Sequence, residues 1–239
     1  MAKPKYKRIL LKLSGESFCT PGGFGIEGDP INSIAERIAR ICKLGPELAI
    51  VVGGGNFLRG ATFSETSHIP RNTADYMGML ATVINAAALQ ETLEKHGQPT
   101  RVLSAIEVKA ICEPFIRRKC LNHLSHGRVT ILAGGTGNPF FSTDTCAALR
   151  AAELDADLII KATKVDGVYT ADPNKDPNAK MIENITYNEV LQQSLKVIDP
   201  AAISLCSEND IPIIVLNIFK EGNITKAING EKVGTLISK

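Results

Sequence analysis

The sequence predicts an α/β protein, a three-layer αβα sandwich around a central, mostly parallel sheet. Short apolar segments alternate along the chain with longer amphipathic ones, which is typical of strands connected by helices. The apolar segments are nearly continuous hydrophobic runs, as expected of strands that helices cover on both faces. Glycine-rich stretches follow several of these runs, and ligands of open α/β sheets bind where the strands end. The glycines therefore indicate where function would lie.

Seven short apolar runs are expected to be strands. They are residues 6–13, 47–52, 100–103, 128–133, 157–161, 212–217 and 235–237. Because helical patterns separate most of them, parallel pairing is favoured over hairpins.

Five segments between these runs are expected to be helices: 31–43, 72–96, 114–126, 144–154 and 200–209. The isoleucines of the first recur at helical spacing. Gly97 and Gly127 follow the second and third, where a glycine commonly ends a helix. Ser142, Thr143 and Asp199 precede the last two and supply capping residues.

One region, residues 164–180, breaks the alternation. Asp166-Gly167 stands between Val165 and the pair Val168-Tyr169, which predicts a short hairpin. Two Asp-Pro turn signals follow it. We see no low-complexity linker and no repeat, so the chain is expected to form a single domain.

Composition excludes several classes of function. The 27 basic and 25 acidic residues leave a formal charge of +2, which argues against a nucleic-acid binder that uses bulk charge. The apolar runs are far shorter than the ~20 residues of a membrane span. Lys12 interrupts the apolar stretch near the N-terminus, so no signal peptide is expected. Six scattered cysteines without a CxxC pair predict reduced, mostly buried thiols in a cytoplasmic protein. The four histidines are dispersed, so no metal site is predicted.

The first candidate site is Lys12 to Glu16, at the end of the first strand. An unpaired ammonium group inside a central strand is costly to bury. Lys12 therefore needs an anion or must extend to solvent, and both interpretations remain open at this point.

The second candidate follows the strand at 47–52, where Gly53, Gly54 and Gly55 are consecutive. Such a run allows close approach of a ligand and directs backbone N–H groups to one place, which suits a phosphate, especially with a helix starting near Asn56. Arg59 would add a permanently charged donor. The alternative is a tight turn, but three glycines exceed what a turn requires.

The third candidate is residues 133–144, which combine glycines, polar side chains and two phenylalanines. These groups suit recognition of a polar ring and an oxyanion. The alternative is a long connecting loop with Phe140 and Phe141 anchored in the core. Asp144 could equally stabilise the start of the following helix.

Standard nucleotide motifs do not explain these loops. No GxxxxGK[ST] motif is present, which disfavours a P-loop kinase. A GxGxxG occurs at residues 23–28, but it begins about ten residues beyond the predicted strand. It therefore fails the structural context of a dinucleotide fingerprint.

Taken together, the motifs resemble those of the bacterial uridylate (UMP) kinases in the amino acid kinase superfamily. The resemblance runs in order from Lys7 to about Ser238, and the GTGNPFF segment points to UMP. It rests on KLSGE at 12–16, VVGGGNFLRG at 51–60, ADYMGMLATVINA at 74–86, GTGNPFFSTD at 135–144 and KATKVDGVYTADP at 161–173.

The resemblance implies transfer of the γ-phosphoryl group of ATP to UMP, with Mg²⁺ carried by ATP and no metal site of the protein's own. Catalytic roles fall on Lys12, Arg59 and Asp144, the last as the acid that orients the catalytic cations. The implied ATP-binding residues are Lys12, Leu13, Ser14, Gly15, Gly55, Arg59, Thr163, Tyr169 and Asp172. The implied UMP-binding residues are Gly54, Asp75, Thr136, Gly137, Asn138, Pro139, Phe140, Phe141, Ser142 and Thr143.

The resemblance also implies an amino acid kinase-like fold with a UMP-binding lobe at roughly 1–155 and an ATP-binding lobe at roughly 156–239. Lys161 is the candidate for the second catalytic lysine that some relatives have. Residues 20–25 match a segment associated with activation by GTP, and UTP inhibition, a homohexamer and a role in pyrimidine biosynthesis are typical. Two alternatives remain: a non-catalytic nucleotide or oxyanion binder, and an amino acid kinase that forms an acylphosphate.

Overall fold

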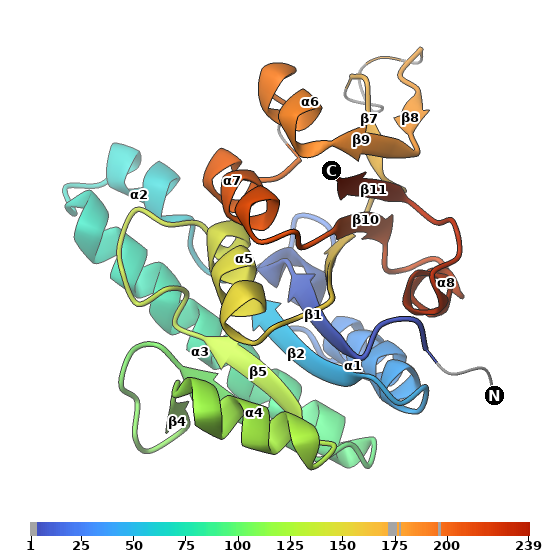
Figure 1. Ribbon diagram of the computed structural model, residues 1–239. Helices are drawn as coiled ribbons and strands as arrows, with labels where there is room; N and C mark the ends of the chain where they lie inside the picture. Colours follow the sequence, from blue (N-terminus) through green and yellow to red (C-terminus); the bar gives the residue numbers. More distant parts are fainter. Residues whose placement is uncertain (1–3, 172–175, 177, 196) are drawn as a thin grey trace.

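Helices cover both faces of one large sheet in the computed structural model, which describes residues 4–171, 176, 178–195 and 197–239 (Figure 1). Its strands are β1 (Arg8–Leu13), β2 (Glu47–Val52), β3 (Thr100–Ser104), β4 (Glu113–Pro114), β5 (Val129–Ala133), β6 (Leu158–Thr163), β9 (Asn184–Thr186), β10 (Ile213–Asn217) and β11 (Thr235–Ser238). They are ordered β4-β3-β5-β2-β1-β6-β10-β11-β9. All neighbours are parallel except β10 and β11. The predicted α/β class and mostly parallel sheet are confirmed.

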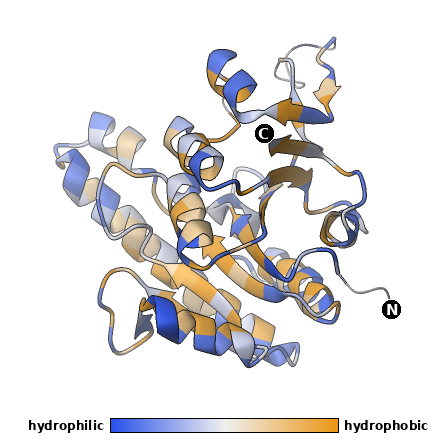
Figure 2. Cartoon of the chain, viewed as in Figure 1, coloured by the Kyte–Doolittle hydropathy of each residue, from blue (hydrophilic) through white to orange (hydrophobic). Residues whose placement is uncertain are grey.

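Two helical layers enclose this sheet. One contains α1 (Gly28–Cys42), α3 (Arg71–Lys95) and α8 (Asn223–Asn229), and the other contains α4 (Arg117–Ser125), α5 (Thr143–Glu153), α6 (Tyr187–Gln192) and α7 (Pro200–Glu208). The short α2 (Gly60–Thr66) has no buried residue, and a 3₁₀ turn, η1 (Gly15–Phe18), follows β1. Figure 2 shows largely apolar strands between helices in which apolar and polar residues are mixed.

The alternation of side chains along β1 divides the core in two. Ile9 and Leu11 pack toward α1 and α3, whereas Leu10 packs toward α5 and α7. Because side chains of a strand alternate between its faces, Lys12 shares the face of Leu10 and faces the α5 layer. The position of this lysine is thus set by the strand register.

The predicted elements are found with small shifts of their ends. All seven strands are present, and the capping residues act as expected: Ser142 Oγ accepts from Thr145 N, and Asp199 Oδ1 accepts from Ala201 N. The third helix begins at Arg117, later than expected, because Pro114 belongs to β4. The short elements β4, α2, α6, α8 and β9 were not predicted from the sequence, because their length gives little periodicity.

The predicted hairpin at Asp166-Gly167 is wrong. Val165 belongs to no strand, and β7 (Val168–Tyr169) instead pairs in antiparallel fashion with β8 (Met181–Ile182). The Asp166 carboxylate accepts hydrogen bonds from Lys220 Nζ at 2.6 Å and Asn217 Nδ2 at 3.3 Å. These contacts with the end of β10 hold the Asp-Gly pair in a bend instead of a two-residue turn.

The cysteines are free, as predicted, and four of the six are buried. Among the helices in the described part of the chain, none is both long and apolar enough to cross a membrane.

Truncating the central strand at Leu11 should destabilise the fold strongly. Leu11 is fully buried in β1, between β2 and β6. We expect Leu11→Ala to lower the free energy of unfolding by about 2–5 kcal/mol, as measured by urea denaturation. Leu191→Ala on α6, where the side chain is partly exposed, should cost less than about 1 kcal/mol. Equal losses at the two positions would contradict this description of the core.

Candidate active site

A cleft of about 450 Å³ opens at the carboxyl ends of β1, β2 and β5. Its walls are the turn after β1, the glycine loop after β2, the first turns of α3 and the loop between β5 and α5. It brings together many of the predicted site residues, namely Lys12, Ser14, Gly15, Gly54, Gly55, Arg59, Asp75, Thr136, Phe140, Phe141, Ser142 and Thr143. Four separate sequence motifs therefore converge on one cavity.

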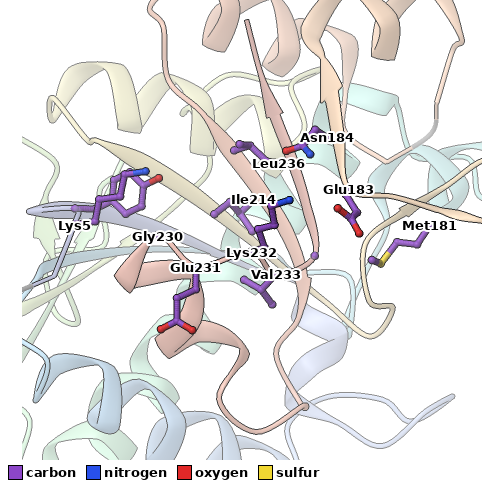
Figure 3. Close-up of a pocket in the computed structure, with 12 residues that line it drawn as sticks. Lys5, Met181, Glu183, Asn184, Ile214, Gly230, Glu231, Lys232, Val233 and Leu236 are labelled. Carbon is purple, nitrogen blue, oxygen red and sulfur yellow. The ribbon is translucent and has the colours of Figure 1, made fainter. Parts of the chain in front are cut away.

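A second cavity, of about 180 Å³, is drawn in Figure 3. It lies over β10 and β11 beside the segment that follows α8, and Lys5, Glu183 and Lys232 contribute charged groups to it. It contains none of the glycine loops or the buried charges described below, so we place the chemistry in the larger cleft.

The Asp144 carboxylate lies between two buried lysines beside the cleft. Of the three residues only Lys12 lines the cleft itself, and all three line a smaller neighbouring cavity. Lys12 Nζ is 2.8 Å from Oδ1, and Lys161 Nζ donates a hydrogen bond to Oδ2 at 2.5 Å. The first contact is an ion pair without hydrogen-bond geometry. Lys161 Nζ also donates to the carbonyl of Val197 at 2.5 Å. All three side chains are at most 15% exposed. The anion that a buried Lys12 required is Asp144.

Strand register explains why these groups meet. Lys12 of β1 and Lys161 of β6 are direct partners in the parallel ladder, so their side chains leave the same face of the sheet. Asp144 is in the first turn of α5, which packs on that face. A carboxylate there also interacts favourably with the helix dipole.

The three groups determine one another's charge. Burial raises the pKa of the Asp144 carboxyl, but the charges of Lys12 and Lys161 and the hydrogen bond from Lys161 outweigh it, and the pKa lies below its usual value. Burial lowers the pKa of the Lys161 ammonium group, and Asp144 reverses only part of that shift. Asp144 therefore favours the charged form of Lys161.

The glycines around the cleft floor serve different purposes. A Cβ at Gly54 would lie 2.7 Å from the carbonyl oxygen of Gly78, so this glycine permits close packing on α3. A Cβ at Gly15, across the cleft floor, would lie 2.8 Å from both Gly53 O and Gly55 N. Gly55 faces the open cleft, and the nearest atom to a Cβ placed there would be Arg59 Nε at 3.8 Å. Close approach of backbone, instead of a positive φ, thus explains Gly54 and Gly15.

The sequence suggested that a helix starting near Asn56 would strengthen a phosphate site, but no helix starts there. The chain turns at Phe57 and Leu58, whose N–H groups donate to Gly54 O, and α2 begins only at Gly60. Arg59 precedes α2 and forms an ion pair with Glu16, with its side chain 66% exposed at the mouth of the cleft.

The loop between β5 and α5 has an unusual backbone conformation and exposes its aromatic side chains to solvent. Gly134, Gly135 and Gly137 have positive φ, as does Phe140, which is unusual for a side chain of this size. Phe140 and Phe141 are 68% and 57% exposed, so the alternative of phenylalanines anchored in the core is wrong. They form an exposed aromatic wall beside the cleft.

Asp75 fixes this loop from α3. Its Oδ2 accepts from Phe140 N at 2.8 Å, and its carboxylate accepts from Arg71 Nε at 2.9 and 3.0 Å. The Arg71 guanidinium also lies 5.7 Å from the centre of the Phe140 ring. Arg71 was not predicted as a site residue. It lies one residue before the helix predicted at 72–96, and only the observed start of α3 at Arg71 places it one helical turn from Asp75.

Several predicted site residues lie outside the cleft. Leu13, Gly137, Asn138 and Pro139 do not line it, and Leu13 is buried on the opposite face of β1. Thr163 and Tyr169 lie on β6 and β7, in the C-terminal half of the chain. The Thr163 hydroxyl lies within hydrogen-bond distance of Val165 O at 2.7 Å and of Leu216 O at 3.1 Å. Asp172 is outside the described residues. Asp199, noted from the sequence only as a cap, lines the cleft.

A family of known proteins shares this architecture. The family model described as "Amino acid kinase family" matches residues 7–217, and the chain belongs to that family. Among solved structures, it is similar to the UMP kinase of Bacillus anthracis, with 39% identity, a TM-score of 0.93 and coverage of 98% of this chain and 96% of that one. The UMP kinase of Ureaplasma parvum gives 39% identity, a TM-score of 0.90 and coverage of 98% and 100%. The uridylate kinase of Archaeoglobus fulgidus gives 28% identity, a TM-score of 0.74 and coverage of 97% and 100%. The predicted family is confirmed.

Removing the charge of Asp144 should destabilise the protein. We expect Asp144→Asn to lower the free energy of unfolding at pH 7 by about 3–5 kcal/mol, because two buried ammonium groups lose their counterion. Since the folded pKa of Asp144 is lowered, its contribution is complete above the ordinary value of 3.8 and is lost as pH falls through the folded value. The difference in free energy of unfolding between wild type and Asp144→Asn, measured by urea denaturation, should therefore decrease as the pH is lowered below 3.8.

Asp166→Asn provides the control, because Asp166 pairs with Lys220 at the surface. It should cost less than about 1 kcal/mol. A loss in Asp144→Asn no larger than in this control would contradict the role given to the buried pair.

Proposed function

We propose that this protein is a UMP kinase, which transfers the γ-phosphoryl group of ATP to UMP and releases UDP and ADP. The observation that carries the proposal is the Lys12–Asp144–Lys161 cluster directly beneath two glycine loops at the carboxyl edge of the sheet. The likeness to UMP kinases at 39% identity over nearly the whole chain supports the choice of acceptor.

On the donor side, backbone N–H groups of Ser14, Gly15 and Gly55 are proposed to hold the ATP phosphates together with Lys12 and Arg59. Leu13 would contribute only through its backbone, since its side chain is buried in the core. Thr163, Tyr169 and Asp172 are proposed to receive the rest of ATP. The position of Thr163 at the carboxyl end of β6, beside β1, is consistent with a nucleotide that crosses this edge of the sheet.

On the acceptor side, Gly54 and residues 136–143 are proposed to hold UMP, and Asp75 to accept from its ribose hydroxyls. Phe140 and Phe141 are exposed at the cleft and suited to contact a flat base. Asp75 already accepts from Phe140 N and Arg71, so it would fix the loop and the ribose at the same time.

The reaction requires positioning and charge neutralisation more than a strong base. A phosphate oxygen of UMP attacks the γ-phosphorus of ATP, the new P–O bond forms as the bond to the bridging oxygen of ADP breaks, and ADP leaves. Lys12 is placed to neutralise charge on the transferred group, and Asp144 holds it there. Lys161 shares the same carboxylate and is proposed as the second cation.

Mg²⁺ is proposed to arrive with ATP. Both oxygens of Asp144 face ammonium groups, so this carboxylate is poorly placed to hold a divalent cation, and the described residues contain no cluster of three or more potential ligands. The donor set thus fits an ion bound mainly by the phosphates of its substrate. When bound, Mg²⁺ would neutralise charge on the phosphates.

Further properties typical of the family are part of the proposal: a single domain over 1–239 with a UMP lobe at roughly 1–155 and an ATP lobe at roughly 156–239, a cytoplasmic role in pyrimidine biosynthesis, GTP activation, UTP inhibition and a homohexamer. The six free cysteines are consistent with a reducing compartment. An exposed apolar stripe on α3, formed by Met77, Leu80 and Ile84, supports a subunit contact.

Lys12→Ala should abolish most of the activity while the fold persists. We expect kcat to fall by about 10²-fold or more in a coupled assay of ADP release with UMP, because a preorganised cation is lost at the transferring group. Lys109→Ala, at an exposed lysine, should keep kcat and the melting temperature. Glutamate, aspartate and carbamate serve as rival acceptors. Turnover with one of them, or no turnover that depends on UMP, would contradict the proposal.

Asp75→Asn should mainly raise the KM for UMP, by about tenfold or more, because a hydrogen bond to a charged group contributes about 1.5–3 kcal/mol. The KM for ATP should change little. Arg71→Met is the matched variant, since it removes the ion pair and keeps the carboxylate. An unchanged KM for UMP in Asp75→Asn would refute the ribose contact, and an equal rise in Arg71→Met would assign the effect to the ion pair.

A further inference from the structure

Asn56 and Asn85 form a buried amide pair beneath the candidate active site. Asn85, on α3, is fully buried, and Asn56, just after the glycine loop, is 4% exposed. Asn56 Nδ2 donates to Asn85 Oδ1 at 2.9 Å, and Asn85 Nδ2 donates to Asn56 Oδ1 at 2.7 Å. The two side chains thus bind each other through a pair of reciprocal hydrogen bonds.

The second N–H of each amide reaches a backbone carbonyl. Asn85 Nδ2 donates to Gly53 O, and Asn56 Nδ2 donates to Gly25 O, both at 2.7 Å. Because a carbonyl can only accept, these contacts fix which end of each amide faces the backbone. All four amide N–H donors are therefore satisfied, and a satisfied buried network of this kind is rigid.

Three backbone segments meet at this pair. Gly53 starts the glycine loop. Gly25 N donates to Asn56 O at 2.9 Å, so Gly25 is attached to both the backbone and the side chain of Asn56. A Cβ at Gly15 would lie 2.4 Å from Asn56 Oδ1, so the backbone proposed to contact ATP rests directly on the amide.

The same face of α3 also holds the other loop. Thr82, three residues before Asn85, accepts from Gly134 N at 2.8 Å through its Oγ1 and is 2% exposed. One helix face thus fixes the starts of both glycine loops. Burial of amides is costly unless each group is paired, and apolar residues could have packed the same space. The stability of the fold alone therefore does not explain why this face of α3 is polar.

We propose that Asn56 and Asn85 are positioning residues for phosphoryl transfer, which hold the turn at Gly15 and the loop at Gly53–Gly55 at the separation that in-line transfer requires. The inference rests on the proposed function. Neither side chain lines the cleft, so each acts through the backbone that it holds. Misplacement of reacting groups by about 1 Å can cost about 10²-fold in rate, so a small shift of these loops is sufficient to impair transfer.

Asn85→Asp tests the proposal with little change of shape. An ionised carboxylate places an oxygen against Gly53 O, whereas a protonated one supplies a single O–H donor. At pH 8 we expect kcat to fall by about tenfold or more, with the KM values for ATP and UMP within about threefold of wild type. The ratio of variant to wild-type kcat should rise as pH is lowered.

Thr130→Val is the matched control. Thr130 is fully buried on β5, outside the cleft, and its Oγ1 accepts only from Cys120 Sγ at 3.5 Å among the described groups. It should keep kcat whatever its effect on the melting temperature. An equal loss of kcat in this control, or a ratio in Asn85→Asp that is independent of pH, would assign the effect to general destabilisation and overturn the proposal.

Hydrogen exchange gives a readout that does not require turnover. Backbone amides in 12–16, 20–28 and 53–58 should exchange faster in Asn85→Asp and in Asn56→Asp than in wild type or Thr130→Val. Unchanged exchange in both variants together with unchanged kcat would overturn the inference. Wild-type protein without UMP-dependent turnover would instead overturn the proposed function, and exchange alone would then decide whether the pair holds these loops.

Discussion

A single carboxylate between two buried ammonium groups is the interaction on which the rest of the site depends. Lys12 and Lys161 are neighbours across two central parallel strands, where two unpaired positive charges would repel each other and resist burial. Asp144 resolves this conflict from the first turn of α5. The ion pair between Lys12 and Asp144 also holds Lys12 where it lines the cleft. The contact that allows a lysine to be buried in the central sheet therefore also makes Lys12 available to a phosphate.

The loops above this cluster are held by hydrogen bonds between side chains of α3 and the backbone of the loops. α3 contributes a buried polar face that binds the starts of two loops. Asp75, near the N-terminal end of α3, binds the second of these loops again at Phe140. Gly54 and Gly15 are required where backbone approaches backbone closely. The cleft is thus largely preformed by one helix and the edge of the sheet, which favours catalysis by positioning.

Strands and long helices could be predicted from the sequence because hydrophobic periodicity reports burial directly. Lys12 was recognised for the same reason, as a charge interrupting an apolar run. Its partner could not be identified from periodicity, because the contact with Asp144 joins elements more than 130 residues apart in the chain. The hairpin prediction at Asp166-Gly167 was wrong because the Asp166 carboxylate accepts hydrogen bonds from Asn217 and Lys220. Such tertiary contacts override a local preference for a turn. Asn56 and Asn85 carried no signal, since a buried amide is recognisable only once its partners are known.

The most direct test of the central role of Lys12 and Asp144 is a structure with UMP and a non-hydrolysable ATP analogue bound together. We expect the γ-phosphoryl group within about 3 Å of Lys12 Nζ, Asp144 still between the two lysines, and the UMP phosphate facing it with uracil against residues 136–143. A nucleotide bound outside this cleft, or a γ-phosphoryl group held away from Lys12, would contradict that role.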